Sequence, residues 1–103
     1  MGLGRLARRL AQRVSDAPTG SYTRRLLEDP DLLTAKLVEE AGELAAANGS
    51  DEVTHEAADV IYFALVAMAR AGVSLDAVEA ELDRRERKVT RRPGNAKPRE
   101  ATR

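Results

Sequence analysis

Residues 36–63, KLVEEAGELAAANGSDEVTHEAADVIYF, contain two apolar helical patterns separated by a turn signal. Apolar residues recur at helical spacing on both sides of Asn48-Gly49-Ser50. Asn and Gly are typical residues at the end of a helix, and a short connection makes consecutive helices antiparallel neighbours. The stretch therefore predicts a helical hairpin at the centre of the fold.

The same stretch carries seven carboxylates in 28 residues. Glu40 and Glu43 lie one turn apart on the first helix, and Glu56 and Asp59 lie one turn apart on the second. Both pairs fall on or beside the apolar stripe, so they are expected to face each other across the hairpin. Half-buried carboxylates repel one another and are costly to desolvate, so a compensating hard cation is expected. Mg²⁺, or alternatively Mn²⁺, prefers such oxygen ligands.

Glu-rich helices that face solvent are common, and this ordinary explanation would suffice for Glu39 or Glu43 alone. It is weaker for Asp59, because Asp is a poor residue for a helix interior and this one lies in an apolar run. His55, the only histidine, is expected to be a surface residue. Phe63 is expected to belong to the core, and Tyr62 either to the core or to a surface that stacks on a base.

The whole sequence predicts five helices, over residues 3–14, 21–28, 31–47, 51–71 and 74–88. Ser21, Asp31 and Ser74 are expected to cap the second, third and fifth helices. Gly72 is expected to end the fourth helix. The fold class is therefore all-α, with residues 1–92 as one domain and residues 93–103 as a basic, flexible tail.

The fourth helix is apolar on every side between residues 57 and 69, where Asp59 is its only charge. A helix of this kind is buried on every side. Four other short helices can hardly surround it, so a second copy of the chain is expected to complete the core. The prediction is a homodimeric helical bundle.

Composition narrows the function classes. A chain of 103 residues without cysteine excludes disulfide frameworks and thiolate metal sites. No apolar stretch is long enough for a membrane span, no signal-peptide pattern is present, and no P-loop or dinucleotide fingerprint occurs. A cytoplasmic protein with neither a membrane nor a nucleic-acid partner is expected.

Charge is distributed unevenly along the chain. Residues 1–25 and 84–103 are basic, whereas residues 26–83 carry fourteen acids and two bases. An acidic centre with basic ends suits a site where cations and a phosphorylated ligand meet. Solvated helix faces and a solvated tail are the alternative explanation.

The pattern Glu39-Glu40-x-x-Glu43 followed by Glu56-x-x-Asp59 resembles the MazG-like all-α nucleoside triphosphate pyrophosphohydrolases. Ser21-Tyr22-Thr23, Glu56-Ala57-Ala58-Asp59 and Gly72-Val73-Ser74-Leu75 resemble, more narrowly, the phosphoribosyl-ATP pyrophosphohydrolase family. Phe63 and residues 88–98 look most like that domain in fused, multifunctional enzymes of histidine biosynthesis.

This resemblance implies Mg²⁺-dependent hydrolysis of phosphoribosyl-ATP to phosphoribosyl-AMP and pyrophosphate, with functional coupling to a phosphoribosyl-AMP cyclohydrolase. It implies metal ligation by Glu40, Glu43, Glu56 and Asp59, and catalytic roles for Glu39, Glu40 and Glu43. The candidates for contacts with the substrate are Lys36, Ser21, Thr23, Arg24, Arg25, Arg91, Arg92 and Lys97. Ser21 and Thr23 could equally serve as helix caps.

Two other functions stay open at this level. A MazG-like house-cleaning enzyme acting on ordinary or damaged nucleotides would have the same metal site. A helical dimerisation or nucleic-acid-binding module would use the basic ends, but would need no acids on its core face.

Overall fold

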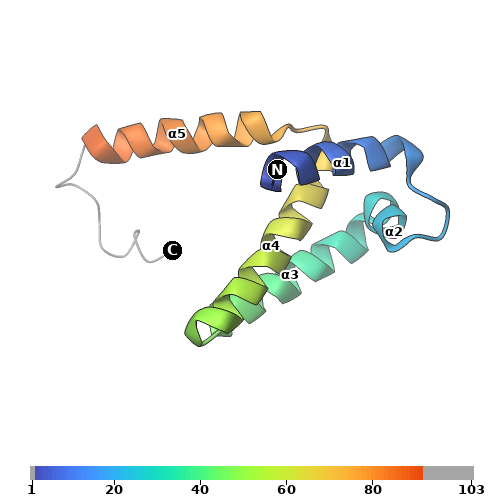
Figure 1. The fold of residues 1–103 in the computed structure, drawn as a ribbon, viewed down its shortest axis with the longest axis horizontal. Helices are drawn as coiled ribbons and strands as arrows, with labels where there is room; N and C mark the ends of the chain where they lie inside the picture. The colour runs from blue at the N-terminus through green and yellow to red at the C-terminus, as the bar shows by residue number, and fades with distance from the viewer. Residues whose placement is uncertain (1, 92–103) are drawn as a thin grey trace.

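The computed structural model describes residues 2–91 of the chain, with side chains as far as Lys88. These residues form five α-helices and no strand, which confirms the predicted all-α fold (Figure 1). The helices are α1 (Gly2–Asp16), α2 (Tyr22–Glu28), α3 (Pro30–Ala46), α4 (Gly49–Ala71) and α5 (Leu75–Arg91). The predicted tail, residues 93–103, lies outside the described residues.

The start of α3 differs from the prediction that Asp31 caps it. Asp29 is the cap, and its side chain accepts a hydrogen bond of 3.1 Å from the backbone N–H of Leu32. Pro30 then occupies the first turn, where its missing N–H costs nothing and its fixed φ suits a helix. Because a residue before proline favours extended backbone, Asp29 is held in the conformation of a cap.

The predicted helix ends at Ser21, Gly72 and Ser74 are confirmed. Three other ends differ, since α1 runs on to Asp16, α4 begins at Gly49 inside the predicted turn, and α5 runs on to Arg91. The Ser21 side chain accepts from the backbone N–H of Arg24, and the Ser74 side chain accepts from that of Ala77, each at 3.1 Å. Gly72 ends α4 in the left-handed region, with φ of 72°. A residue with a Cβ is strained in that conformation, so Gly72 allows the chain to turn sharply from α4 into α5.

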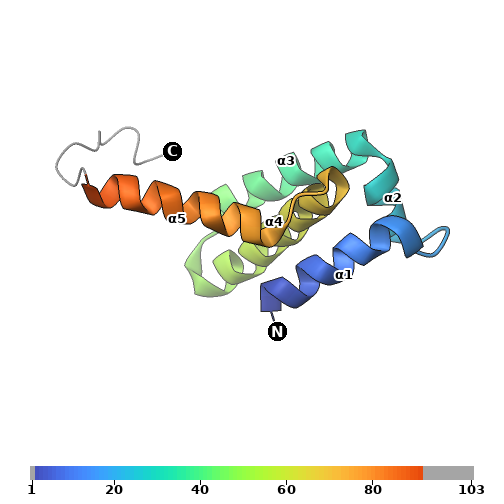
Figure 2. The ribbon, with the colours of Figure 1, turned by 90° about the horizontal axis from the view of Figure 1, so that it is seen from above.

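The α3–α4 hairpin is the centre of the fold, as predicted. Both views show the two helices side by side, with α1 against α4 and α2 beside the start of α3 (Figures 1 and 2). The core cluster comes from four helices and contains Leu10, Leu26, Leu33, Phe63, Leu65 and Val66. Leu26 of α2 and Val66 of α4 are fully buried, so both helices contribute side chains to the centre of the core.

Among its described side chains α5 has no buried residue, although Leu75 at its start packs against the core. The rest of α5 extends apart from the hairpin (Figures 1 and 2). Its Leu82 is 57% exposed, and Val53 and Ile61 of α4 are each 42% exposed. The chain therefore leaves apolar surface uncovered on the helix whose sequence predicted a second copy. The homodimer itself stays a prediction.

Among the helices that the structure describes, none is by itself long and apolar enough to cross a membrane. Only α4 taken together with Leu75–Lys88 passes by length and composition, and these two are bent by 113°.

Candidate metal site

Two groups of possible metal ligands lie on the two helices of the hairpin. α3 carries Glu39, Glu40 and Glu43, and α4 carries His55, Glu56 and Asp59. Within each group, one ligand atom from every residue lies within 4.8 Å of the others. The spacing of three and four residues produces this grouping, because it places side chains on one face of a helix.

Glu40 is the buried charged residue of the described chain, with 7% of its surface exposed. Its Oε1 and the Oε1 of Glu56 are the buried side-chain oxygens for which the described residues offer no hydrogen-bond partner. Buried polar atoms in folded proteins are normally paired, and an unpaired buried carboxylate oxygen is costly. The two helices therefore each aim one unsatisfied anionic oxygen into the protein.

The carboxylates of the two helices interact electrostatically. The pKa of Glu40 is raised from its ordinary value by burial above all, then by the charges of Glu43 and Asp59. Lys36 opposes this rise. Asp59 lies on α4, so its charge acts on Glu40 from across the hairpin.

Lys36 lies at the edge of the acidic group. Its Nζ donates a hydrogen bond of 3.1 Å to Oε1 of Glu39 and lies 3.8 Å from Oε2 of Glu40. The same Nζ lies 5.8 Å from the centre of the Phe63 ring, within the range of a cation–π contact. The hydrogen bond to Glu39 is the main cause that raises the pKa of Lys36.

His55 is a residue whose contact the sequence interpretation missed. Its side chain is 74% exposed, as expected for a surface residue, yet Nε2 lies 3.5 Å from Oδ2 of Asp59. The signal was present in the sequence, because residues four apart on a helix are neighbours. His55 thus stands at the solvent end of the acidic group.

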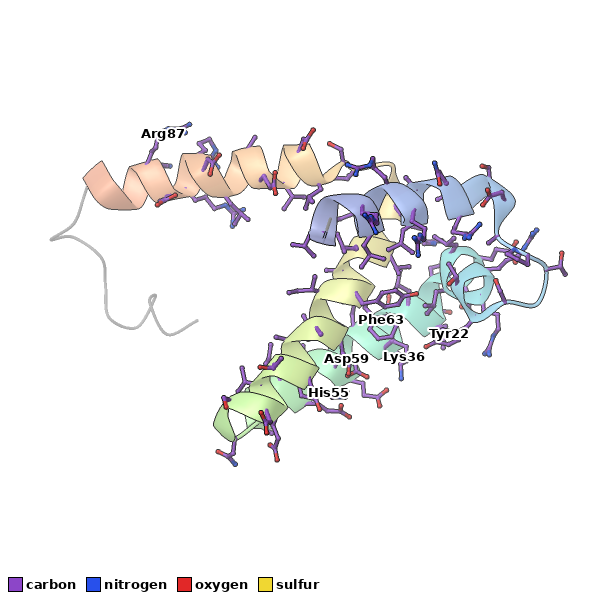
Figure 3. All side chains as sticks on the ribbon, in the orientation of Figure 1. Tyr22, Lys36, His55, Asp59, Phe63 and Arg87 are labelled. Atoms are coloured by element: carbon purple, nitrogen blue, oxygen red, sulfur yellow. The ribbon has the colours of Figure 1, made fainter. Side chains whose placement is uncertain are left out.

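An aromatic wall borders the site. Phe63 is buried, as predicted, and Tyr62 meets its ring edge-on with 5.2 Å between the ring centres. Tyr22 of α2 lies near enough to Lys36 to contribute to its raised pKa, after Glu39. Figure 3 shows Lys36, Phe63, Asp59 and His55 along the hairpin, with Tyr22 of α2 beside the end that carries Lys36.

The residues around Tyr22 have structural partners. Ser21 caps α2, and Arg24 donates from Nη1 to the Ala17 carbonyl at 2.9 Å and from Nε to Glu28 at 2.8 Å. Thr23 is half-buried and Arg25 is exposed. These contacts hold the α1–α2 loop and the start of α2 next to the site. Three predicted substrate contacts, the Arg91 side chain, Arg92 and Lys97, lie outside the described residues.

A hard divalent cation fits this arrangement. The donors are carboxylates, one of them is buried, and the two unpartnered oxygens come from adjacent helices. Oxygen donors of this kind suit Mg²⁺ or Mn²⁺.

Comparison with known proteins gives one family. The model of the phosphoribosyl-ATP pyrophosphohydrolase family matches residues 3–86. A phosphoribosyl-ATP pyrophosphatase of Caulobacter vibrioides is 48% identical over 87 residues, which cover 82% of this chain and 81% of that protein. No solved structure matches the chain.

Multifunctional proteins are also similar. A histidine biosynthesis trifunctional protein of Komagataella pastoris is 53% identical over 94% of this chain. A histidine biosynthesis bifunctional protein of Schizosaccharomyces pombe is 49% identical over 93% of it. The chain spans only 12% and 23% of the length of these two relatives. The predicted likeness to a domain of fused histidine enzymes is confirmed, and this chain belongs to the phosphoribosyl-ATP pyrophosphohydrolase family.

Proposed function

We propose that this chain hydrolyses phosphoribosyl-ATP to phosphoribosyl-AMP and pyrophosphate as a step of histidine biosynthesis. The observation that carries the proposal is the pair of buried, unpartnered oxygens on Glu40 and Glu56. They belong to the acidic pattern in the part of the chain that matches the family. A helical interaction module has no use for such atoms, because they destabilise a fold without a ligand.

The reaction breaks the bond between the α- and β-phosphates. It needs neutralisation of phosphate charge, an oriented water molecule and an in-line approach. Glu40, Glu43, Glu56 and Asp59 hold a divalent cation, Mg²⁺ or Mn²⁺. When bound, this cation neutralises charge on the phosphate oxygens and polarises the phosphorus–oxygen bonds.

The other residues of the site bind the substrate and orient the attacking water. Glu39 is an exposed acid of α3, and its carboxylate accepts a hydrogen bond from the attacking water. Lys36 donates to an oxygen of the substrate's triphosphate, as an ammonium group does in many phosphate sites. Thr23 and Arg25 face substrate phosphates near Tyr22, whereas Ser21 and Arg24 act by holding that segment in place. Arg91, Arg92 and Lys97 are proposed as further phosphate contacts.

A second copy of the chain covers the apolar surface that one copy leaves open. Val38 on α3 is 70% exposed, and Ile61 on α4 and Leu82 on α5 are also exposed. Burial of such side chains is a typical driving force of obligate dimers. Sedimentation equilibrium is expected to give twice the 11.2 kDa of the chain. A monomer at micromolar concentration would contradict this part of the proposal.

The bifunctional and trifunctional relatives support a coupling to other steps of the same pathway. We propose that the phosphoribosyl-AMP released here passes to a phosphoribosyl-AMP cyclohydrolase, in the cytoplasm.

The test is pyrophosphate release from phosphoribosyl-ATP beside a panel of canonical nucleoside triphosphates, with Mg²⁺ and with EDTA. We expect turnover that depends on Mg²⁺ and is confined to phosphoribosyl-ATP. Turnover of the simple triphosphates instead would indicate a house-cleaning enzyme. Absence of turnover on every substrate, by a folded protein, would overturn the enzymatic function.

A further inference from the structure

Lys36 is unusual because its ammonium group lies beside carboxylates of the proposed metal site. Residues 26–83 contain one lysine and one arginine, Lys36 and Arg70. Arg70 is engaged elsewhere, since its Nε donates to the Leu27 carbonyl at 2.8 Å. Apart from the largely exposed His55, which lies near Asp59, Lys36 is therefore the base of this acidic segment that contacts the acids of the site.

The contacts of Lys36 satisfy the site only in part. Nζ holds Glu39 Oε1 at 3.1 Å and approaches Glu40 Oε2 at 3.8 Å. Among the described residues, the other oxygen of Glu40 has no hydrogen-bond partner, and neither has the buried oxygen of Glu56. A single ammonium group at the edge thus offsets some of the negative charge, but it does not pair with the two buried oxygens.

A divalent cation bound to those buried oxygens would repel the ammonium group of Lys36. Glu40 would then contact a +2 charge through one oxygen, with the +1 charge of Lys36 close to the other oxygen. Like charges repel more strongly where burial excludes water, as it does around Glu40. The lysine side chain is long and flexible, and is 27% exposed here, so it is free to move outward.

We propose that Lys36 is a resident counter-cation, which neutralises Glu39 and Glu40 in the empty site and is displaced when the divalent cation binds. The displaced ammonium group then meets a substrate phosphate. This inference rests on the proposed function and adds an order of events to it. In its resident position the ammonium group also lies 5.8 Å from the centre of the Phe63 ring, a cation–π contact at the edge of the site.

Displacement has a consequence that thermodynamic linkage makes measurable. Lys36 competes with the metal for the acids, so its removal strengthens metal binding. The same removal weakens substrate binding, because a phosphate contact is lost. Two effects of opposite sign from one substitution distinguish displacement from general damage to the site.

The experiment titrates Mg²⁺ into the substrate-free protein by calorimetry and measures the KM for phosphoribosyl-ATP at saturating Mg²⁺. For Lys36→Met we expect Mg²⁺ affinity to rise about fivefold or more, as for a coupling of ordinary size. The KM is expected to rise by a similar factor. Lys36→Gln is measured alongside as a second neutral variant, and circular dichroism verifies that both variants are helical.

Two control variants test whether the effect depends on the position of Lys36 and on its positive charge. Lys88→Met removes the same charge from the exposed surface of α5 and is expected to leave Mg²⁺ affinity unchanged. Lys36→Arg keeps the charge and is expected to bind Mg²⁺ as the wild type does.

The outcomes separate this inference from the proposed function. Wild-type protein that binds Mg²⁺, with both neutral variants binding it equally or more weakly, overturns the displacement of Lys36 and leaves the metal site intact. Wild-type protein that binds no Mg²⁺ overturns both. Tighter Mg²⁺ binding with a raised KM supports the inference.

Discussion

Glu40 on α3 and Asp59 on α4 repel each other across the helical hairpin. Burial above all, then Glu43, then Asp59 and Glu39 raise the pKa of Glu40, so four separate causes disfavour its charged form. The chain thus gathers acids on both helices at the cost of mutual repulsion. A fold gains nothing from this arrangement by itself, whereas the proposed divalent cation would offset the repulsion.

Replacement of Glu40 by glutamine tests that explanation. We expect pyrophosphate release to fall at least about a hundredfold, since a direct ligand is lost. In EDTA the thermal midpoint is expected to stay equal or to rise, because a repelled, buried carboxylate has been replaced by a neutral group of the same shape. Thermal melts with and without Mg²⁺ measure both effects. A large loss of stability in EDTA would show that the Glu40 carboxylate supports the fold.

His55 and Asp59 form a matched pair for mutation, since they lie 3.5 Å apart but differ in exposure. Asp59→Asn removes a proposed ligand, and Mg²⁺ affinity is expected to fall about tenfold or more. His55→Gln changes a side chain that is mostly in solvent, and its Mg²⁺ affinity is expected to stay within about twofold of wild type. Mg²⁺ calorimetry on both variants provides the comparison. Equal losses would make His55 a ligand as well.

Much of this arrangement could be predicted from the sequence, because it is local. Asn48-Gly49 between two apolar patterns predicts the hairpin, and residue spacing predicts that Glu40 and Asp59 face each other. The burial of Glu40 and Phe63 follows from their place on the apolar stripes. These features depend on helix geometry within a single hairpin, so one sequence is enough to find them.

Other features depend on competition between contacts and could not be predicted. Asp29 and Asp31 are both plausible caps, and only the backbone preference imposed by Pro30 decides for Asp29. The hydrogen bond from Arg24 to the Ala17 carbonyl depends on the path of the α1–α2 loop, which residue spacing does not describe. The direction of α5 depends on the turn at Gly72 and on packing against other helices, which no local pattern describes.

The core provides a prediction about stability. Leu26 of α2 is fully buried against the neighbouring helices, so Leu26→Ala should lower the free energy of unfolding by about 2–5 kcal/mol. Leu3→Ala, at a position that is 45% exposed, should change it by no more than about 0.5 kcal/mol. Chemical denaturation of both variants tests this difference. Similar costs at the two positions would place the core elsewhere.

Glu81 gives a prediction about pH. Arg84 and Arg85 contact its carboxylate, and their hydrogen bonds lower its pKa from 4.5 to about 2. Because the folded pKa lies below the ordinary value, the stabilisation is present above pH 4.5 and is lost as the pH falls towards 2. All three side chains are substantially exposed, so the effect is small and is screened by salt.

The measurement compares the thermal midpoints of wild type and Glu81→Gln at pH 7, 4.5 and 3. The wild type is expected to melt slightly higher at pH 7, and the gap is expected to shrink as the pH falls. A gap that widens on acidification would contradict the depressed pKa.

The most direct test of the central claim is anomalous scattering from crystals grown with Mn²⁺, which marks the position of a bound cation. The account predicts an anomalous peak between α3 and α4, within bonding distance of the Oε1 atoms of Glu40 and Glu56. A well-ordered crystal with both carboxylates visible and no peak between them would contradict it.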